Sequence, residues 1–403
     1  MFTIVNLSIF TFVTYYFTMD FDKIFTGNRE QSLHGRYVTL NHIEPLIKSH
    51  SKNYEVEVLG SSVMNKPLYG ITVGTGKSRI FIWSQMHGNE STTTKAIFDF
   101  LNLLGSDDDL AVQLTASFTF YILPMVNPDG AELYIRENAN KVDLNRDALN
   151  LTQPESIVLR KAFDNFDPHF CYNMHDQRGI FGAGSTGKPA TVSFLAPSYN
   201  DERSINNSRQ TAINLISAMN DALQDYIPGQ VGRFDDSFNI NCVGDMFQSL
   251  GVPTVLFEAG HYQDDYIREI TRKYIFIALL SGFNAIYENV IAVNKNHEYF
   301  AIPQNRITFY DFVYRNVKIN YENKEKITNF ASHYKEVLFE NSVIFEACIN
   351  KIGDLEEFQG HREYDCNGAL FTSDDHNHLP IIDKRADFII GFDRKFVNGA
   401  EET

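Results

Sequence analysis

The sequence contains few cysteines and no close pair of them. Only four occur in 403 residues, they lie far apart, and none forms a C-x-x-C pair: Cys171, Cys242, Cys348 and Cys366. A framework of disulfides needs closely spaced, paired cysteines, so this class of protein is excluded. We interpret the four as free thiols in a reducing compartment, which predicts a cytoplasmic protein.

Positive charge is also scarce. The chain has 35 Lys and Arg against 51 Asp and Glu, a net charge of −16. Proteins whose main partner is a nucleic acid usually carry a basic surface, so no nucleic-acid partner is expected. The sequence also lacks a glycine-rich phosphate loop and a G-x-S-x-G motif, which argues against a serine hydrolase. Apolar and charged contents of 43% and 21% are ordinary for a globular protein.

The first 18 residues are apolar but lack the features of a standard signal. No Lys or Arg precedes the apolar run and no small-residue cleavage site follows it. The run is also marginal for a membrane span. We expect residues 1–18 to be an atypical leader or a mis-assigned start, with Met19 as the first residue. If the segment is a real anchor or signal, the protein is membrane-anchored or secreted; otherwise no membrane partner is expected.

The pattern of the remaining chain predicts two domains. Across residues 19–300, short apolar runs alternate with amphipathic stretches, which is typical of an α/β sandwich with a parallel or mixed sheet. From about residue 301 to 403 the pattern changes to short alternating runs separated by Asn, Gly and Asp. This second part predicts a small antiparallel β domain.

Three residues follow predicted strands in a way that favours a metal site. His87 and Glu90 come directly after the apolar run 80–83 and before a helical pattern, and His175 follows the run 169–174. Ligands bind at such strand ends in α/β sheets. Two His and one Glu, with a fourth position left open, are the ligand set of a catalytic zinc ion. The alternative for each histidine alone is a core or surface position.

Two further segments could complete a catalytic site. Arg136 and the run Asp143-Leu-Asn145-Arg146 offer guanidinium groups for a carboxylate or an oxyanion, and Asp143 could accept the free ring N–H of a ligating histidine. Glu258 ends a very apolar strand, where an unpaired carboxylate is costly, and it could act as a general base. The alternatives are a charged surface loop and a strand-end Glu paired with a nearby cation.

The order of these motifs resembles the zinc carboxypeptidases of the carboxypeptidase A type, as in a divergent bacterial-style member. The resemblance covers about residues 50–290 and rests on His-Gly-Asn-Glu (87–90), Asn-Pro-Asp-Gly (127–130), Arg136, Asp-Leu-Asn-Arg (143–146), His175 and Glu258. It implies a mixed sheet of about eight strands sandwiched by helices.

The resemblance also implies the following roles. His87, Glu90 and His175 would bind one Zn²⁺ per chain; Glu258 would be the general base; Arg136 would stabilise the oxyanion; Asn145 and Arg146 would bind the substrate's terminal carboxylate; Asp143 would orient His87. The implied activity is hydrolysis of the C-terminal peptide bond. The alternative is a zinc-dependent deacylase of small N-acyl amino acids, similar to aspartoacylase and succinylglutamate desuccinylase, and a third reading is a non-catalytic binding protein.

One family feature is missing. A mobile Tyr usually precedes an Asp by some ten residues and closes over the substrate. Asp245 could correspond to that Asp, but residues 233–242 contain no Tyr. Tyr262 is a candidate replacement, and Arg233 could instead bring a second positive charge to the pocket.

Overall fold

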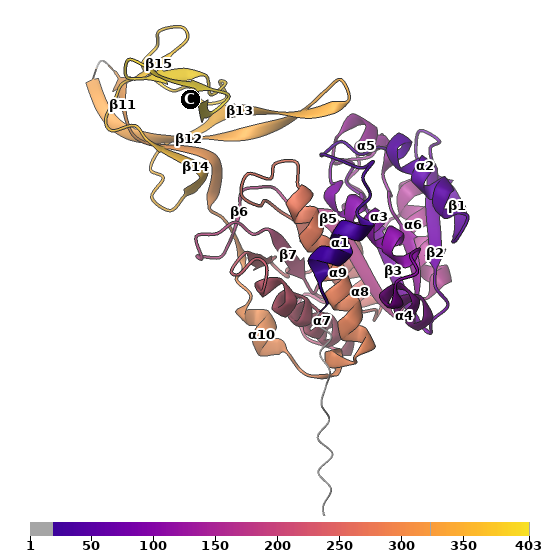
Figure 1. The fold of residues 1–403 in the computed structure, drawn as a ribbon. Helices are drawn as coiled ribbons and strands as arrows, with labels where there is room; N and C mark the ends of the chain where they lie inside the picture. The colour runs from indigo at the N-terminus through magenta and orange to yellow at the C-terminus, as the bar shows by residue number, and fades with distance from the viewer. Residues whose placement is uncertain (1–18, 323, 403) are drawn as a thin grey trace, which may run out of the picture.

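The computed structural model describes residues 19–322 and 324–402, so the predicted leader at residues 1–18 lies outside the described residues. The described chain forms an α/β lobe and a smaller β lobe (Figure 1). Within these residues, no helix combines the length and the apolar content that crossing a bilayer requires.

A mixed eight-stranded sheet forms the centre of the α/β lobe, which confirms the predicted fold class. Its order is β1-β2-β4-β3-β5-β9-β7-β8. The central pairs β4–β3, β3–β5 and β5–β9 are parallel, so the carboxyl ends of these strands share one edge. The strands are β1 (Glu55–Ser61), β2 (Pro67–Val73), β3 (Ser78–Ser84), β4 (Phe118–Leu123), β5 (Phe170–Asp176), β7 (Val192–Leu195), β8 (Val231–Arg233) and β9 (Thr254–Ala259).

Helices cover both faces of this sheet. They are α1 (Phe21–Asn28), α2 (Leu40–His50), α3 (Thr92–Leu104), α4 (Asp109–Ser117), α5 (Pro128–Leu133), α6 (Pro154–Phe166), α7 (Asn207–Gln224), α8 (Val243–Ser249), α9 (Glu269–Tyr287) and α10 (Asn296–Ala301), with 3-10 turns at Leu144–Arg146 and Val290–Ala292. Helices α1, α3, α7 and α9 pack together on one face, and α6 and α8 pack on the other.

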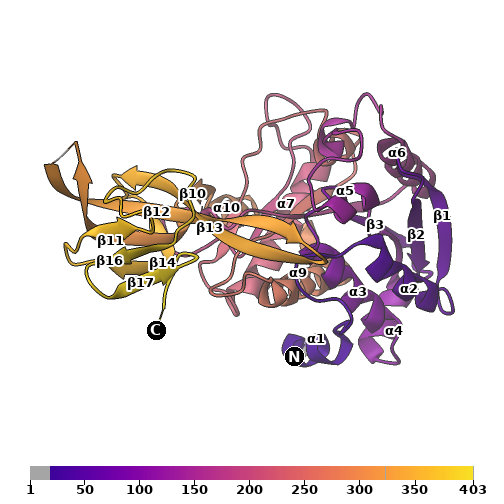
Figure 2. The same cartoon turned by 90° about the horizontal axis from the view of Figure 1, so that it is seen from above.

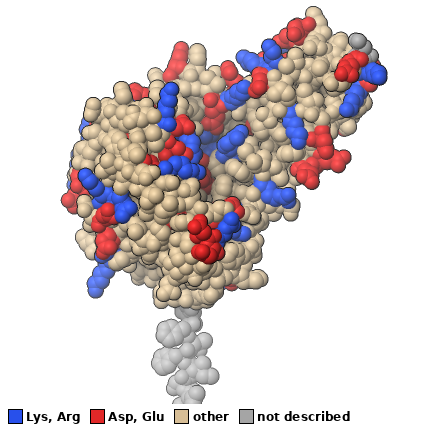
Figure 3. Space-filling model, turned by 180° about the vertical axis from the view of Figure 1, so that it is seen from behind, with Lys and Arg blue, Asp and Glu red and all other residues tan. Residues whose placement is uncertain are grey.

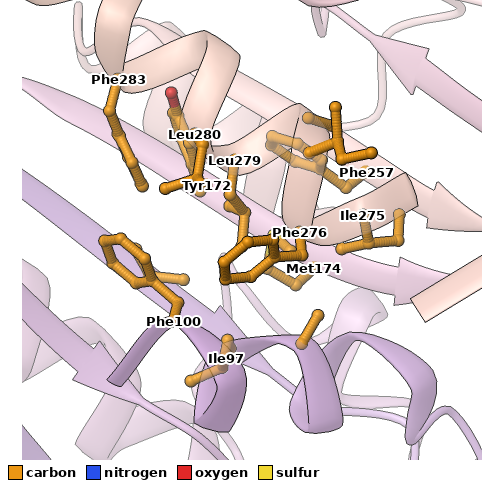
Figure 4. Packing of buried hydrophobic residues seen from close by; sticks show 14 of the residues in the cluster. Ile97, Phe100, Tyr172, Met174, Phe257, Ile275, Phe276, Leu279, Leu280 and Phe283 are labelled. Atoms are coloured by element: carbon orange, nitrogen blue, oxygen red, sulfur yellow. The ribbon is translucent and has the colours of Figure 1, made fainter. Parts of the chain in front are cut away.

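The larger core lies between the sheet and helices α3 and α9. Phe100 of α3, Phe276 and Phe283 of α9 and Tyr172 of β5 are buried and interdigitate there (Figure 4). Almost every residue of α3 is buried, as expected for a helix that is enclosed on all sides. The amino end of α3 is therefore held firmly, directly behind the loop that carries Glu90.

Buried ion pairs also fix α3 to α9. Asp99 and Arg272 are fully buried and pair at 2.5 Å, and the Lys95 Nζ lies 2.5 Å from Glu269 Oε1. Charges buried in this way are tolerated only when they are paired. Burial nevertheless lowers the pKa of Lys95 to about 8, because the attraction of the Glu269 carboxylate only partly offsets the loss of hydration of the ammonium group.

The β lobe consists of two small sheets. The first has the order β13-β12-β11-β14 and the second β15-β16-β17-β18. Their strands are β11 (Phe309–Tyr321), β12 (Lys324–Phe339), β13 (Ser342–Gly353), β14 (Gln359–Asp365), β15 (Phe371–Ser373), β16 (Phe388–Ile390), β17 (Arg394–Val397) and β18 (Ala400–Glu401). All these pairs are antiparallel except β11–β14, which is parallel. The predicted small antiparallel β region is thus confirmed, with this one exception.

Two elements connect the lobes. The short strand β10 (Asn305–Ile307) pairs with β6 (Phe181–Ala183) of the α/β lobe before the chain enters β11. The long hairpin of β12 and β13 reaches back over the α/β lobe (Figures 1 and 2). Its strand β12 places Glu336 2.9 Å from the buried guanidinium of Arg36. The β lobe is therefore docked on the side of the molecule that carries the candidate site.

Candidate metal centre and active site

His87, Glu90 and His175 lie together at the carboxyl edge of the sheet. The Nδ1 atoms of His87 and His175 are 3.1 Å apart, and each lies 2.8 Å from a different oxygen of Glu90. All three side chains are buried, and one ligand atom from each lies within 4.8 Å of the others. The structure thus brings together three residues that span 88 positions of sequence.

The local chain geometry explains this convergence. His87 follows β3 in a tight loop that ends at the first turn of α3, and Glu90 N donates to His87 O at 3.1 Å. His175 is the sixth residue of β5, which pairs in parallel with β3. Neighbouring parallel strands deliver their ends to the same edge, so the two imidazoles meet with ring centroids 4.7 Å apart.

The donor set fits a zinc ion. His87 Nε2 donates to Asp143 Oδ1 at 3.1 Å, which fixes the proton on Nε2. This leaves the Nδ1 lone pair facing Glu90 and His175, with Arg136 Nη1 also 3.1 Å from it. That lone pair, the Nδ1 of His175 and the carboxylate of Glu90 point at one another inside the protein. Burial alone would raise the pKa of Glu90, but the positive charge that the neighbouring imidazoles carry when protonated lowers it well below its usual range, and a bound cation would replace those protons. An ionised carboxylate with two neutral imidazoles is the ligand chemistry that zinc prefers.

Arg136 and Asp143 form the side wall of this group. The Arg136 Nε and Nη2 both lie 3.0 Å from Asp143 Oδ2, and its Nη1 lies 3.3 Å from Glu90 Oε1. Burial would raise the pKa of the Asp143 carboxyl, but His87 and Arg136 lower it well below its usual range. Asp143 therefore stays ionised and holds both the imidazole and the guanidinium in place.

Asn145 and Arg146 stand on the 3-10 turn that Asp143 caps. Asp143 Oδ1 accepts from Asn145 N at 2.8 Å, and Asn145 Oδ1 accepts from Val243 N at 2.9 Å. The exposed Arg146 donates from Nη1 to the carbonyl of Asn145 at 2.7 Å and contacts Cys242 Sγ at 3.2 Å. The turn thus presents one guanidinium to the same cavity that the metal group lines.

Glu258 is the last residue but one of β9 and lines the same cavity as the metal group. It is the register partner of His175 in the parallel pair β5–β9, and its side chain is half-buried. Burial raises the pKa of this carboxyl well above its usual range, and the nearby carboxylates of Glu90 and Asp176 raise it further. A carboxyl with a raised pKa beside a cleft is suited to exchanging protons.

These residues line one cavity of about 580 Å³. It contains His87, Glu90, Arg136, Asn145, Arg146, His175 and Glu258, together with residues that the sequence analysis did not assign, including Asp176, Arg178, Phe234 and Phe238. We call it the main cavity. Phe234 and Phe238 lie in the segment where the family's Tyr is missing, so aromatic rings without a hydroxyl line the cavity there.

The two suggested replacements for that Tyr lie outside the lining of the main cavity in this structure. Tyr262 packs against the larger core and meets Tyr274 with ring centroids 5.7 Å apart. Arg233 lies over the rings of Tyr299 and Phe300, 5.3 Å from each centroid. Neither residue lines the cavity. In this structure, packing against neighbouring aromatic rings holds both side chains away from the main cavity.

An α/β sheet with a buried His-Glu-His group at its strand ends is the framework of a metal-dependent protein. Comparison with known families gives the class: residues 39–183 match the family described as zinc carboxypeptidase. This segment, about a third of the chain, is therefore similar to a zinc carboxypeptidase domain. The matched residues include His87, Glu90, Arg136, the segment 143–146 and His175, whereas Glu258 lies beyond them.

Relatives among curated proteins match short segments. Carboxypeptidase 2 of Trichophyton rubrum is 30% identical over 100 residues, which is 25% of this chain and 19% of the relative. Gamma-D-glutamyl-L-diamino acid endopeptidase 1 of Lysinibacillus sphaericus is 36% identical over 85 residues, 19% of this chain and 22% of the relative. The aligned segments thus span about a fifth of the length of these relatives.

Solved structures share the fold over a longer stretch. A metallo-carboxypeptidase from Burkholderia cenocepacia is similar with a TM-score of 0.50 and 17% identity, over 62% of this chain and 69% of that one. The carboxypeptidase A of Helicoverpa armigera has a TM-score of 0.50 and 15% identity, over 68% of this chain and 80% of that one. At these identities the likeness establishes the fold of the α/β lobe.

Proposed function

We propose that the protein is a zinc metallocarboxypeptidase that removes the C-terminal residue of a peptide. The observation that carries this proposal is the position of Glu258, one strand away from His175 and in the same cavity as the buried His-Glu-His group and Arg146. A metal group, a proton acceptor and a carboxylate-binding group thus face one space. Hydrolysis of a terminal peptide bond needs these three.

His87, Glu90 and His175 would hold one zinc ion per chain. When bound, zinc supplies Lewis-acid polarisation of the scissile carbonyl and of the attacking water. Asp143 keeps the proton of His87 on Nε2, so that Nδ1 remains a ligand atom.

Glu258 would move the proton. Its carboxylate accepts a proton as water attacks the carbonyl carbon, and it then delivers that proton to the leaving amine nitrogen. The raised pKa of this carboxyl favours the first transfer because it makes the carboxylate a stronger base. Proton uptake and release at one group leave Glu258 unchanged after each turnover.

The three cationic or polar side chains would bind the substrate. Arg136 lies against Glu90, where its guanidinium can stabilise the negative charge that develops on the carbonyl oxygen. Arg146 can form a two-point contact with the terminal carboxylate, and Asn145 can add a hydrogen bond. Because the 3-10 turn holds both residues in place, the bound carboxylate would put the bond before the last residue at the site of cleavage.

The deacylase alternative has less support from the geometry. A small acyl amino acid would need a pocket that ends near the metal group. Beyond Glu90 and Arg136, however, the site continues into a second hollow between the lobes. This second hollow offers space for a chain on the far side of the cleaved bond, which favours a peptide.

A substrate panel tests the proposal. Peptides with free and amidated carboxyl ends and N-acyl amino acids would be incubated with the zinc-loaded protein, and again after chelation and zinc return. We expect release of the last residue from free-acid peptides only, lost on chelation and restored by zinc. Turnover of acyl amino acids alone would favour the deacylase. The absence of any turnover, with zinc bound, would favour a binding protein.

The cysteines bear on the compartment. All four are free, and three of them are buried. We propose a cytoplasmic location, because unpaired thiols persist in a reducing compartment. Fractionation of the producing cells, followed by detection of the native protein, tests this; recovery from the medium or the membrane fraction would contradict it.

A further inference from the structure

A second cavity, of about 360 Å³, lies between the α/β lobe and the β lobe. We call it the interlobe cavity. His261, Tyr266 and Arg268 line it from the α/β lobe, and Asp311, His333 and Glu336 line it from the β lobe. Figure 3 shows the hollow between the lobes, with acidic and basic side chains on its walls. Neither the family match nor the proposed catalytic roles account for it.

The wall that the β lobe contributes is held in a fixed position. Glu336 of β12 pairs with Arg36 at 2.9 Å and accepts from the Tyr134 hydroxyl at 2.5 Å. His361 Nε2 donates to the carbonyl of Gly179 at 2.7 Å. These contacts join the β lobe to Arg36, Tyr134 and Gly179 of the α/β lobe, so the shape of the cavity is fixed by the packing of the two lobes.

The interlobe cavity is continuous with the main cavity. Both are lined by Glu90, Arg136, Asp176, Gln177 and Arg178. The proposed carboxylate-binding residues Asn145 and Arg146 line only the main cavity. The terminal residue of a substrate would therefore lie in the main cavity, and the chain before the cleaved bond would leave through the interlobe cavity.

The chemistry of the walls selects what can lie there. His261 is only 3% exposed, and its Nε2 has no hydrogen-bond partner within the described chain. Arg36 is 7% exposed and its Nε also lacks a partner there. A large apolar side chain would cut these groups and the nearby carboxylates off from water without replacing their hydrogen bonds, which is costly. A small polar residue could bond to them.

We propose that the interlobe cavity binds the residue before the cleaved bond, and that the β lobe makes this site selective for small polar side chains over large apolar ones. This inference rests on the proposed peptidase activity and names its substrate class. Asp311 and His333 are the selective residues from the β lobe: the ring of His333 lies 3.2 Å from Asp311 Oδ2, and both face the cavity.

Two peptides that differ only in the residue before the cleaved bond, Ser or Phe, test the proposal. We expect the wild-type kcat/KM to be at least about tenfold higher for the Ser peptide, because a Phe side chain would leave buried polar groups of the wall unpaired. Asp311→Asn and His333→Ala should each reduce this ratio to less than about threefold, because they remove charge or bulk from the wall.

A matched control lies on the same strand. Lys335 is the neighbour of Glu336 on β12 but points to solvent, where it pairs with Asp383 at 3.2 Å. Lys335→Gln should leave the Ser/Phe ratio unchanged. Binding of both peptides to Glu258→Gln, measured by calorimetric titration, gives a second readout that does not depend on turnover and should show the same preference.

The outcomes separate this inference from the proposed function. Equal rates and equal binding of the two peptides by the wild-type protein would overturn the selectivity and leave the peptidase intact. A ratio that changes as much in Lys335→Gln as in Asp311→Asn would overturn the role of the β lobe. Failure of the zinc-loaded protein to cleave any peptide would refute the peptidase and this inference with it.

Discussion

Glu258 and His175 are direct register partners on adjacent parallel strands, β9 and β5. A buried sheet is a rigid support, so the distance between the proposed base and the metal ligand is set by strand pairing and not by a loop. Ser193 of β7 pairs with Glu258 from the other side. The backbone of Glu258 is thus held between two strands. A substitution that changes only the carboxylate, Glu258→Gln, therefore tests its chemistry without moving the backbone.

Replacing the base should stop the reaction without removing the metal. Glu258→Gln keeps the shape of the side chain but cannot accept a proton, so kcat should fall by about 10²–10⁴-fold. The zinc content should remain near one ion per chain, because the three donor side chains are untouched. Steady-state kinetics and metal analysis of the same preparation check this. Glu357→Gln, in the exposed loop after β13, is the control, and retained activity in Glu258→Gln would refute the assignment.

Removing the carboxylate behind His87 should weaken metal binding. Asp143 accepts the Nε2–H of His87 at 3.1 Å and also binds Arg136, so Asp143→Ala frees both side chains. Zinc affinity should fall by about 10–100-fold, as is usual for such supporting partners. Competition with a chromogenic chelator measures it. Asp164→Ala, an exposed carboxylate on α6, should have wild-type affinity; equal affinity in both variants would contradict the role of Asp143.

The proposed carboxylate contact predicts a substrate-dependent effect. Arg146→Ala should lower kcat/KM for free-acid peptides by about 10–100-fold, the value of a hydrogen-bonded charge contact, mainly through a higher KM. Peptides with an amidated end lack the charge, so their slow cleavage should change little. Parallel kinetics on the two peptide series measure the difference. A uniform loss on both series would show that Arg146 supports the fold of the site and not the recognition of the carboxylate.

Asp245 predicts a pH-dependent change in stability. Burial raises the pKa of this carboxyl to about 6, although the backbone N–H of Asn239 bonds to it. An unfolded Asp ionises near pH 4, so the folded state loses stability relative to the unfolded state as the pH rises from about 4 through 6. Asp245→Asn avoids this loss. Its free energy of unfolding should exceed the wild-type value by up to roughly 3 kcal/mol at pH 8 and by little at pH 4.

Urea unfolding at the two pH values measures this difference. The comparison isolates one group, because every other titrating residue is shared by the two proteins. An equal difference between variant and wild type at pH 4 and pH 8 would show that Asp245 ionises normally in the folded state.

Much of the fold could be predicted from sequence. The predicted strands at 80–83 and 169–174 correspond to β3 (Ser78–Ser84) and β5 (Phe170–Asp176), because their apolar runs mark them clearly. The motif Asn-Pro-Asp-Gly at 127–130 consists of residues that favour turns, but it begins helix α5: Asn127 caps the helix by accepting from Gly130 N, and Pro128 occupies its first turn. The same residue types favour turns and helix starts, so sequence alone did not distinguish them.

The interlobe cavity could not be predicted. Arg36 and Glu336 are 300 positions apart, and no local pattern indicates that a β hairpin folds back over the first lobe. His261, three residues after Glu258, has no partner in the sequence pattern that would mark it as part of a cavity wall. Its Nε2, which has no hydrogen-bond partner within the described residues, faces the interlobe cavity because the β lobe docks over it. Contacts between lobes depend on docking geometry, which hydrophobic periodicity does not encode.

The glycine of the His-Gly-Asn-Glu motif predicts a steric requirement. A Cβ on Gly88 would lie 1.9 Å from the carbonyl carbon of Gly130 and 2.2 Å from the nitrogen of Ala131, both backbone atoms of α5. The metal-binding loop therefore packs directly on the helix that Asn127 caps, which explains why both motifs occur together. Gly88→Ala must displace one of them, and because the loop carries His87 and Glu90, zinc binding should be lost together with stability.

We expect Gly88→Ala to lower the free energy of unfolding by about 1–3 kcal/mol, the usual cost of overpacking. The variant should also bind zinc weakly or not at all. Gly27→Ala is the matched control, since no atom lies within 4 Å of its added Cβ in α1, and alanine should stabilise that helix slightly. Thermal unfolding and metal analysis of the two variants measure both effects. Wild-type zinc content in Gly88→Ala would mean that the loop can move away from α5 without disturbing its ligands, and the close packing would then not position the metal group.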